Sequence, residues 1–153
     1  MVLYFEDLAV GQVYELGTWK VTAEDIVDYA QQWDPQDYHL DEGLAQQTPF
    51  RGLVASGWHS ASIFMRLYVD GFLHETSCQG GVGVDGLWWL QPVRPGDTLR
   101  ARIRVEEVRP SRKVPDRGTV KFSWELHNQD GEQVLQMYGV NLFGRRTPAA
   151  VED

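Results

Sequence analysis

The sequence predicts an α+β fold, in which one curved antiparallel sheet wraps around a long central helix. From about Val54 to His74 the apolar residues face nearly every side of a helix, which is typical of a helix that is buried all round. Long segments with alternating apolar and polar residues follow it, separated by turn signals, as in antiparallel strands joined by hairpins. A single sheet that curves around the helix would bury it.

A shorter amphipathic helix is expected first, over residues 22–33. It begins with Thr22, a typical helix cap, and Asp25 stands three positions later. The apolar side chains that follow recur with helical spacing, at Ile26, Tyr29, Ala30 and Trp33. The pattern therefore predicts a helix with one face turned to the core.

Four ionisable side chains stand directly behind this helix: Asp34, Asp37, His39 and Asp41. Pro35 ends the helix, because a proline biases the residue before it away from helical angles. Residues 34–39 are expected to form a loop, and residues 41–47 one or two further helical turns that Asp41 could cap. The cluster is either a solvated turn or a catalytic pair. A calcium loop is not expected, since its glycine and distant glutamate are missing.

The strands are expected after the central helix. One covers residues 83–92 and ends at Pro92, and a Pro-Gly-Asp turn at 95–97 leads to the next. Residues 98–110 alternate between arginines and apolar side chains, the latter being Leu99, Ala101, Ile103 and Val105. Residues 119–144 form a hairpin that turns at Asp130-Gly131, and its first strand should bury Val120, Phe122, Trp124 and Leu126. Residues 110–118 read as a flexible loop.

The length and composition fit one domain over residues 1–153, which ends in a loose tail from Thr147. Of its residues 42% are hydrophobic and 12% aromatic, enough for a real core. No apolar run approaches the roughly 18 residues of a membrane span, and the N-terminus does not resemble a signal peptide, so we expect a cytoplasmic protein without membrane partners. The single cysteine, Cys78, has no partner for an internal disulfide or thiolate zinc site and is expected to be buried.

The formal charge of −8 disfavours nucleic acid as a partner. Basic residues nevertheless gather in one segment, at Arg94, Arg100, Arg102, Arg104, Arg109, Arg112, Lys113 and Arg117. The segment could hold a small anionic ligand, or it could be the solvated face of a strand.

Several of these stretches occur in the same order in a known family. The stretch from Asp34 to Leu67, followed by residues 92–112 and by "NQDGEQV", resembles the MaoC-like acyl dehydratases, relatives of the (R)-specific enoyl-CoA hydratases. The resemblance covers about residues 4–147, which would be the core of the domain. It implies a hot-dog fold, a homodimer or higher oligomer whose sheets join edge to edge, and a CoA thioester as substrate.

The resemblance also implies site residues. In that family an aspartate precedes a histidine by five positions, which matches Asp34 and His39 and makes them the expected catalytic pair. The backbone N–H of a glycine at the start of the central helix binds the thioester oxygen, which matches Gly57. Ser62 or Ser60 could support the aspartate or the water. Trp58, beside the glycine, is expected to contact substrate.

This sequence departs from the family pattern in two places. Gln36-Asp37 replaces an asparagine-proline pair, and Ser56 replaces a histidine before the helix glycine. His59 is expected to be a satisfied core or interface histidine. If residues 83–92 form a strand, Trp88 and Trp89 point to opposite faces and at most one of them lines an acyl pocket.

The expected activity is that of a hydro-lyase, which adds or removes water across the 2,3 double bond of an enoyl-CoA. The reaction needs a base, an acid and a donor for the enolate oxygen, and it uses no cofactor or metal apart from the CoA of the substrate. Arg94, Arg112 and Lys113 stand near turns and could bind the CoA phosphates. Which member of the Asp34 and His39 pair is the base stays open. Two alternatives remain: a hot-dog thioesterase, and a non-catalytic subunit that binds acyl-CoA.

Overall fold

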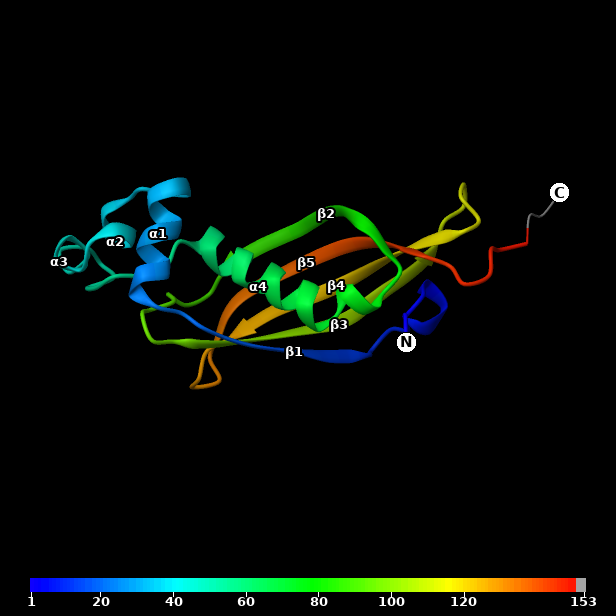
Figure 1. Cartoon of the computed structure of the whole chain (residues 1–153), viewed down its shortest axis with the longest axis horizontal. Coiled ribbons are helices and arrows are strands. Elements are labelled where there is room, and N and C mark those ends of the chain that lie inside the picture. The colour runs from blue at the N-terminus through cyan, green and yellow to red at the C-terminus, as the bar shows by residue number, and fades with distance from the viewer. Residues whose placement is uncertain (151–153) are drawn as a thin grey trace.

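One five-stranded antiparallel sheet forms the centre of the computed structural model, which describes residues 1–150. The strands lie in the order β1-β3-β4-β5-β2 (Figure 1). They are β1 (Val13–Lys20), β2 (Cys78–Trp89), β3 (Thr98–Pro110), β4 (Arg117–His127) and β5 (Gln133–Gly144). The predicted hairpin strands β3, β4 and β5 are neighbours in the sheet, and each pairs antiparallel with the next.

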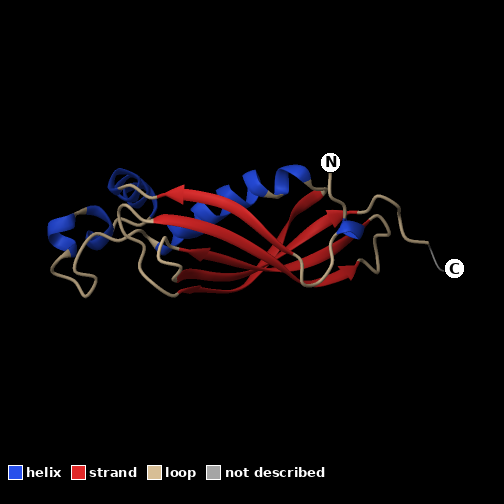
Figure 2. Cartoon of the chain, turned by 90° about the horizontal axis from the view of Figure 1, so that it is seen from below, coloured by secondary structure: helices blue, strands red, loops and turns tan. Residues whose placement is uncertain are grey.

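The long helix α4 (Gly57–Gly71) runs along one face of this twisted sheet (Figures 1 and 2). This arrangement is the α+β hot-dog fold that the resemblance predicts. The helix is shorter than predicted, because it begins at Gly57 rather than near Val54 and ends at Gly71, before a single 3-10 turn, η2 (Leu73–Glu75).

The prediction that this helix is buried all round is wrong for the single chain. Phe64 is fully buried, whereas its neighbour Met65 is 42% exposed. The reason is geometric: the sheet covers only one side of α4, so apolar residues on the other side stay at the surface of the chain.

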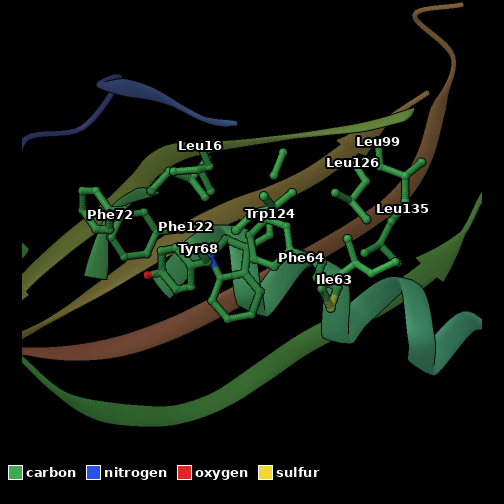
Figure 3. Close-up of a cluster of buried hydrophobic side chains, with 14 of the residues drawn as sticks. Leu16, Ile63, Phe64, Tyr68, Phe72, Leu99, Phe122, Trp124, Leu126 and Leu135 are labelled. Atoms are coloured by element: carbon green, nitrogen blue, oxygen red, sulfur yellow. The ribbon is translucent and has the colours of Figure 1, made fainter. Parts of the chain in front are cut away.

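Aromatic side chains fill the space between α4 and the sheet (Figure 3). Phe64 stacks on Trp124 of β4 with ring centroids 5.1 Å apart, and Tyr68 meets Phe122 edge to face at 6.0 Å. The Tyr68 hydroxyl donates to the side-chain oxygen of Asn141 over 3.1 Å. The residues of β3 and β4 that were predicted to point inward are all buried, which confirms the alternation in both strands.

Two edge strands differ from the prediction. Strand β1 was not predicted at all: its register shifts between Glu15 and Gly17, and only one of its residues is buried. Strand β2 covers 78–89 rather than 83–92, and three register shifts interrupt its pairing with β5. Cys78, predicted to be buried, is half-buried at the start of β2.

Three short helices lie beyond one end of the sheet, close to the start of α4 (Figure 1). They are α1 (Ala23–Trp33), α2 (Asp37–Leu40) and α3 (Glu42–Ala45). The Thr22 hydroxyl accepts from the Asp25 N–H, and the Asp41 carboxylate accepts from the Leu44 N–H, so both predicted caps are confirmed. The predicted loop over 34–39 is only partly correct, since α2 begins inside it.

The two termini meet at the opposite end of the molecule (Figure 1). Arg146 donates to the Asp7 carboxylate over 2.7 Å, and the Glu6 carboxylate accepts from the N–H of Thr147. The Ala149 N–H donates to the carbonyl of Pro115, so the predicted loose tail is held as far as Ala149. Residues 151–153 of that tail lie outside the described residues. No helix within residues 1–150 is long and apolar enough to cross a membrane.

Candidate active site

Asp34 and His39 lie side by side where α1 ends and α2 begins. The Asp34 N–H still donates to the carbonyl of Ala30 at the end of α1, while the side chain is free to turn toward α2. The single turn of α2 places the His39 ring beside it, with His39 Nε2 3.2 Å from Asp34 Oδ2. The five-residue spacing therefore brings the two groups into contact.

A carbonyl on the far side of the His39 ring fixes its tautomer. His39 Nδ1 lies 2.6 Å from the Val54 carbonyl oxygen, which is only an acceptor, so Nδ1 carries a hydrogen and donates it. His39 is only 5% exposed. Nε2 then faces the carboxylate, and the contact is favourable when one proton is held between Nε2 and Oδ2.

The surroundings of Asp34 favour its ionised form. Burial alone raises the pKa of Asp34, but hydrogen bonds from Gln36 and Ser56 and the proximity of His39 outweigh this and hold the pKa below its ordinary value. Ser56, at the N-cap of α4, was seen in the sequence only as a departure from a family pattern. It is one of the groups that lower the pKa of Asp34, whereas support of this aspartate was expected from Ser60 or Ser62.

The pair borders a cavity of about 420 Å³. Its polar lining includes Asp34, Gln36, His39 and Ser60. The walls are mainly apolar, formed by Phe50, Trp58, Trp89, Leu90, Val93 and Val134. A mainly apolar cavity with a few polar groups suits a ligand with an aliphatic portion and one reactive polar centre.

Gly57 lies in this cavity as the first residue of α4. Its N–H has no acceptor within the helix, and the helix N-terminus carries a positive partial charge. A Cβ at this position would lie 2.2 Å from Cε2 of Trp89, so the indole ring packs directly on the glycine. Trp88 instead packs near Tyr138, with ring centroids 6.4 Å apart. Of the two neighbours Trp88 and Trp89, only Trp89 lines the cavity, as expected for adjacent residues on a strand.

The predicted substrate-binding residues are divided between the cavity and other places. Ser60 and Trp58 line the cavity. Ser62 is exposed on another side of α4, where its hydroxyl donates to the Trp58 carbonyl over 2.8 Å, so a role beside Asp34 is ruled out for Ser62 in this structure.

The three predicted phosphate ligands are also separated. Arg94 lies near the cavity, since its guanidinium donates to the carbonyl of Phe50, a wall residue, over 2.6 Å. Arg112 and Lys113 lie in the connection between β3 and β4, at the opposite end of the molecule from α1 and α2 (Figure 1). A single chain therefore does not bring these two residues to the cavity.

His59 is buried next to the site but not satisfied as predicted. Its ring stacks on Tyr29 with centroids 4.7 Å apart, and its Nδ1 has no hydrogen-bond partner among the described residues. Burial lowers the pKa of His59 and favours the neutral ring. Within residues 1–150, no group of three or more His, Cys, Asp or Glu side chains is arranged to hold a metal ion.

Comparison with protein families matches residues 7–123 to a model described as "MaoC like domain". A 3-hydroxybutyryl-CoA dehydratase from Methylorubrum extorquens is 33% identical over 118 residues, 73% of this chain and 69% of the relative. An (R)-specific enoyl-CoA hydratase from Rhodospirillum rubrum is 30% identical over 116 residues, 72% and 74% of the two chains. The crystal structure of a MaoC-like dehydratase from Rhodospirillum rubrum, 40% identical, superposes with a TM-score of 0.87 over 95% of this chain and 99% of the other.

Proposed function

Because the chain belongs to the MaoC-like domain family, we propose that it is a hydro-lyase that adds water to, or removes it from, the 2,3 double bond of an enoyl-CoA thioester. The observation that carries the proposal is the contact of 3.2 Å between Asp34 and His39 in the lining of a mainly apolar cavity. The names of the two relatives support the same class of reaction.

In the proposed hydration, the Asp34 and His39 pair handles both protons. The oxygen of a water molecule bonds to C3, one member of the pair takes a proton from that water, and the other member delivers a proton to C2. The pair ends the step with as many protons as it began with, and dehydration is the reverse. Since both groups lie on one side of the cavity, the two additions occur on the same face of the double bond.

Gly57 is proposed to stabilise the charge that develops on the thioester oxygen. Its N–H lies at the positive end of α4, and the missing Cβ lets the Trp89 ring that lines the cavity pack directly on this residue. Donors of this kind typically contribute about 3 kcal/mol to the transition state. The step forms a C–O and a C–H bond without net oxidation or reduction, so it needs no redox cofactor. The proposal includes no metal, and CoA takes part as a portion of the substrate.

We also propose that the protein works as a homodimer. Large apolar side chains remain exposed on α4 and β2 of the single chain, among them Trp58, Met65, Val82, Val84 and Trp88. Covering such a surface is favourable in water. Size-exclusion chromatography with light scattering should give twice the mass of one chain, and a monomer at micromolar concentration would contradict this part of the proposal.

The activity can be tested by following the absorbance of the enoyl thioester. Purified protein is mixed with crotonyl-CoA and, separately, with a longer 2-enoyl-CoA, while a thiol reagent reports free CoA. Loss of the enoyl absorbance without free CoA supports the hydro-lyase. Release of free CoA supports a thioesterase instead. If neither the enoyl absorbance nor free CoA changes, but a separate titration shows that both compounds bind, a non-catalytic subunit is supported.

A further inference from the structure

Two side chains that are not part of the proton-transfer pair connect to it in a short chain of hydrogen bonds. The Tyr38 hydroxyl donates to Oε1 of Gln36 over 2.5 Å, and Nε2 of Gln36 donates to Oδ1 of Asp34 over 2.6 Å. All three residues line the cavity. We propose that Tyr38 and Gln36 are positioning residues that hold the Asp34 carboxylate in the orientation that faces His39.

The direction of these hydrogen bonds follows from the chemistry of the groups. A carboxylate accepts only, so the Gln36 amide must turn its NH₂ toward Asp34. The phenol hydroxyl can donate to the amide oxygen, and this contact favours the one amide orientation that serves Asp34. The amide could in principle be turned by 180°, which would exchange its oxygen and its NH₂ group. Among the described residues, the Tyr38 hydroxyl is the contact to the amide oxygen that selects the orientation with NH₂ toward Asp34.

The backbone holds both residues in place. The Gln36 N–H donates to the Asp34 carbonyl over 2.8 Å, and the Gln36 carbonyl accepts from the His39 N–H over 2.9 Å. The carbonyl of Tyr38 accepts from the N–H of Val54, the same residue whose carbonyl accepts from the His39 ring. Movement of Gln36 or Tyr38 would therefore disturb both members of the pair.

The two carboxylate oxygens of Asp34 have different partners. Oδ2 faces Nε2 of His39 and Oδ1 accepts from Gln36, while Ser56 at the N-cap of α4 is a further group that lowers the pKa of Asp34. His39 of α2 is the charged or titratable group that acts on Asp34 within the described residues. Gln36 is thus the principal contact that can fix the carboxylate plane without taking part in proton transfer.

This inference rests on the function proposed above, because positioning matters for catalysis only if Asp34 is catalytic. The test uses Tyr38→Phe, Gln36→Leu and the double variant. Tyr38→Phe keeps the ring, which packs against His39 at 4.4 Å and Phe50 at 5.2 Å, and Gln36 is exposed, so both variants should fold. Tyr138→Phe on β5 and Gln31→Leu on the exposed side of α1 are matched controls outside the cavity lining.

Two measurements are made on each protein. The first is the pH dependence of kcat/KM for crotonyl-CoA. We expect Tyr38→Phe and Gln36→Leu to lower kcat about three- to tenfold and to move the acidic limb to higher pH, because Asp34 loses a hydrogen bond to its charged form. The double variant should be no worse than Gln36→Leu, since Tyr38 acts through Gln36.

The second measurement needs no turnover. Carboxyl carbons of ¹³C-labelled aspartate are titrated by NMR, with Asp34→Asn used to assign the Asp34 signal. The proposal predicts that Asp34 titrates at higher pH in both variants than in the wild type and the controls. If the wild type is active and the variants change neither the acidic limb nor the Asp34 titration, the inference about Tyr38 and Gln36 is wrong, while the proposed function stands. A wild type that never hydrates enoyl-CoA overturns the proposed function, and the titration then decides by itself whether the contacts hold Asp34.

Discussion

At the scale of single residues, Gly57 is where a small change should have the largest effect on activity. An added Cβ would collide with the Trp89 ring, so this ring or the start of α4 would have to shift beside the cavity. We expect Gly57→Ala to lower kcat/KM for crotonyl-CoA by about 10²-fold, the scale for losing one oxyanion donor. Gly83→Ala on β2 is the matched control, because a Cβ there meets no atom within 4 Å. Full activity of a folded Gly57→Ala would remove Gly57 from the proposed mechanism.

The resemblance to the MaoC-like family, rather than a local pattern, pointed to Asp34, His39 and Gly57, and the five-residue spacing of the first two is visible in the sequence. The sequence could not predict the contacts of Val54 and Ser56. Both residues lie well beyond His39 in sequence, and no local periodicity reports that the segment before α4 folds back over α2. The contact of Tyr38 with Gln36 had a local signal, since the two residues are separated by one position and both have polar ends.

At the scale of elements, α4 should tolerate change on one side only. Phe64 is fully buried against Trp124, so Phe64→Ala should lower the free energy of unfolding by about 3–5 kcal/mol. The neighbouring Met65 is half-exposed, and Met65→Ala should cost less than about 1 kcal/mol. Urea denaturation of both variants at low protein concentration measures the difference. Equal costs would mean that α4 is covered on both sides, as the sequence alone predicted.

The strands show which elements a periodic pattern can reveal. Buried residues alternate in β3 from Leu99 to Val105, and most of β4 alternates as well, with Ser123 as an extra buried residue, so both patterns are visible in the sequence. Strands β1 and β2 lie at the two edges of the sheet and carry register shifts. In β1 the shift coincides with Gly17, whose φ of 105° is left-handed and suits glycine. A bulge of this kind breaks the period of two, which explains why the prediction missed β1 and shortened β2.

At the scale of the whole molecule, stability should fall in acid. Hydrogen bonds from Arg146 lower the pKa of Asp7 below its ordinary value of 3.8, and the pKa of Asp34 is also lowered, as described above. Protons therefore bind more tightly to these groups in the unfolded chain, so their stabilisation is complete above about pH 4 and is lost below it. Urea midpoints measured from pH 7 to pH 3 should drop at the acidic end. Asp7→Asn should show a smaller drop, and an identical pH dependence would contradict this assignment.

The length of β3 explains why a single chain separates the predicted phosphate ligands. Arg94 precedes β3 and Arg112 follows it, and a strand of 13 residues is roughly 40 Å long. The two arginines must therefore lie at opposite ends of the sheet, which the length of the alternating segment already implied. The separation of Lys113 from the cavity has the same cause.

The most direct test of the proposed mechanism compares Asp34→Asn and His39→Gln with the wild type. For each protein, kcat for crotonyl-CoA hydration, the dissociation constant of a non-reactive acyl-CoA and the melting temperature are measured. We expect each variant to lose at least ~10²-fold in kcat, the usual scale for a general acid or base, with nearly unchanged binding and melting temperature. Two folded variants that both keep the wild-type kcat would contradict the assignment of Asp34 and His39 as the proton-transfer pair.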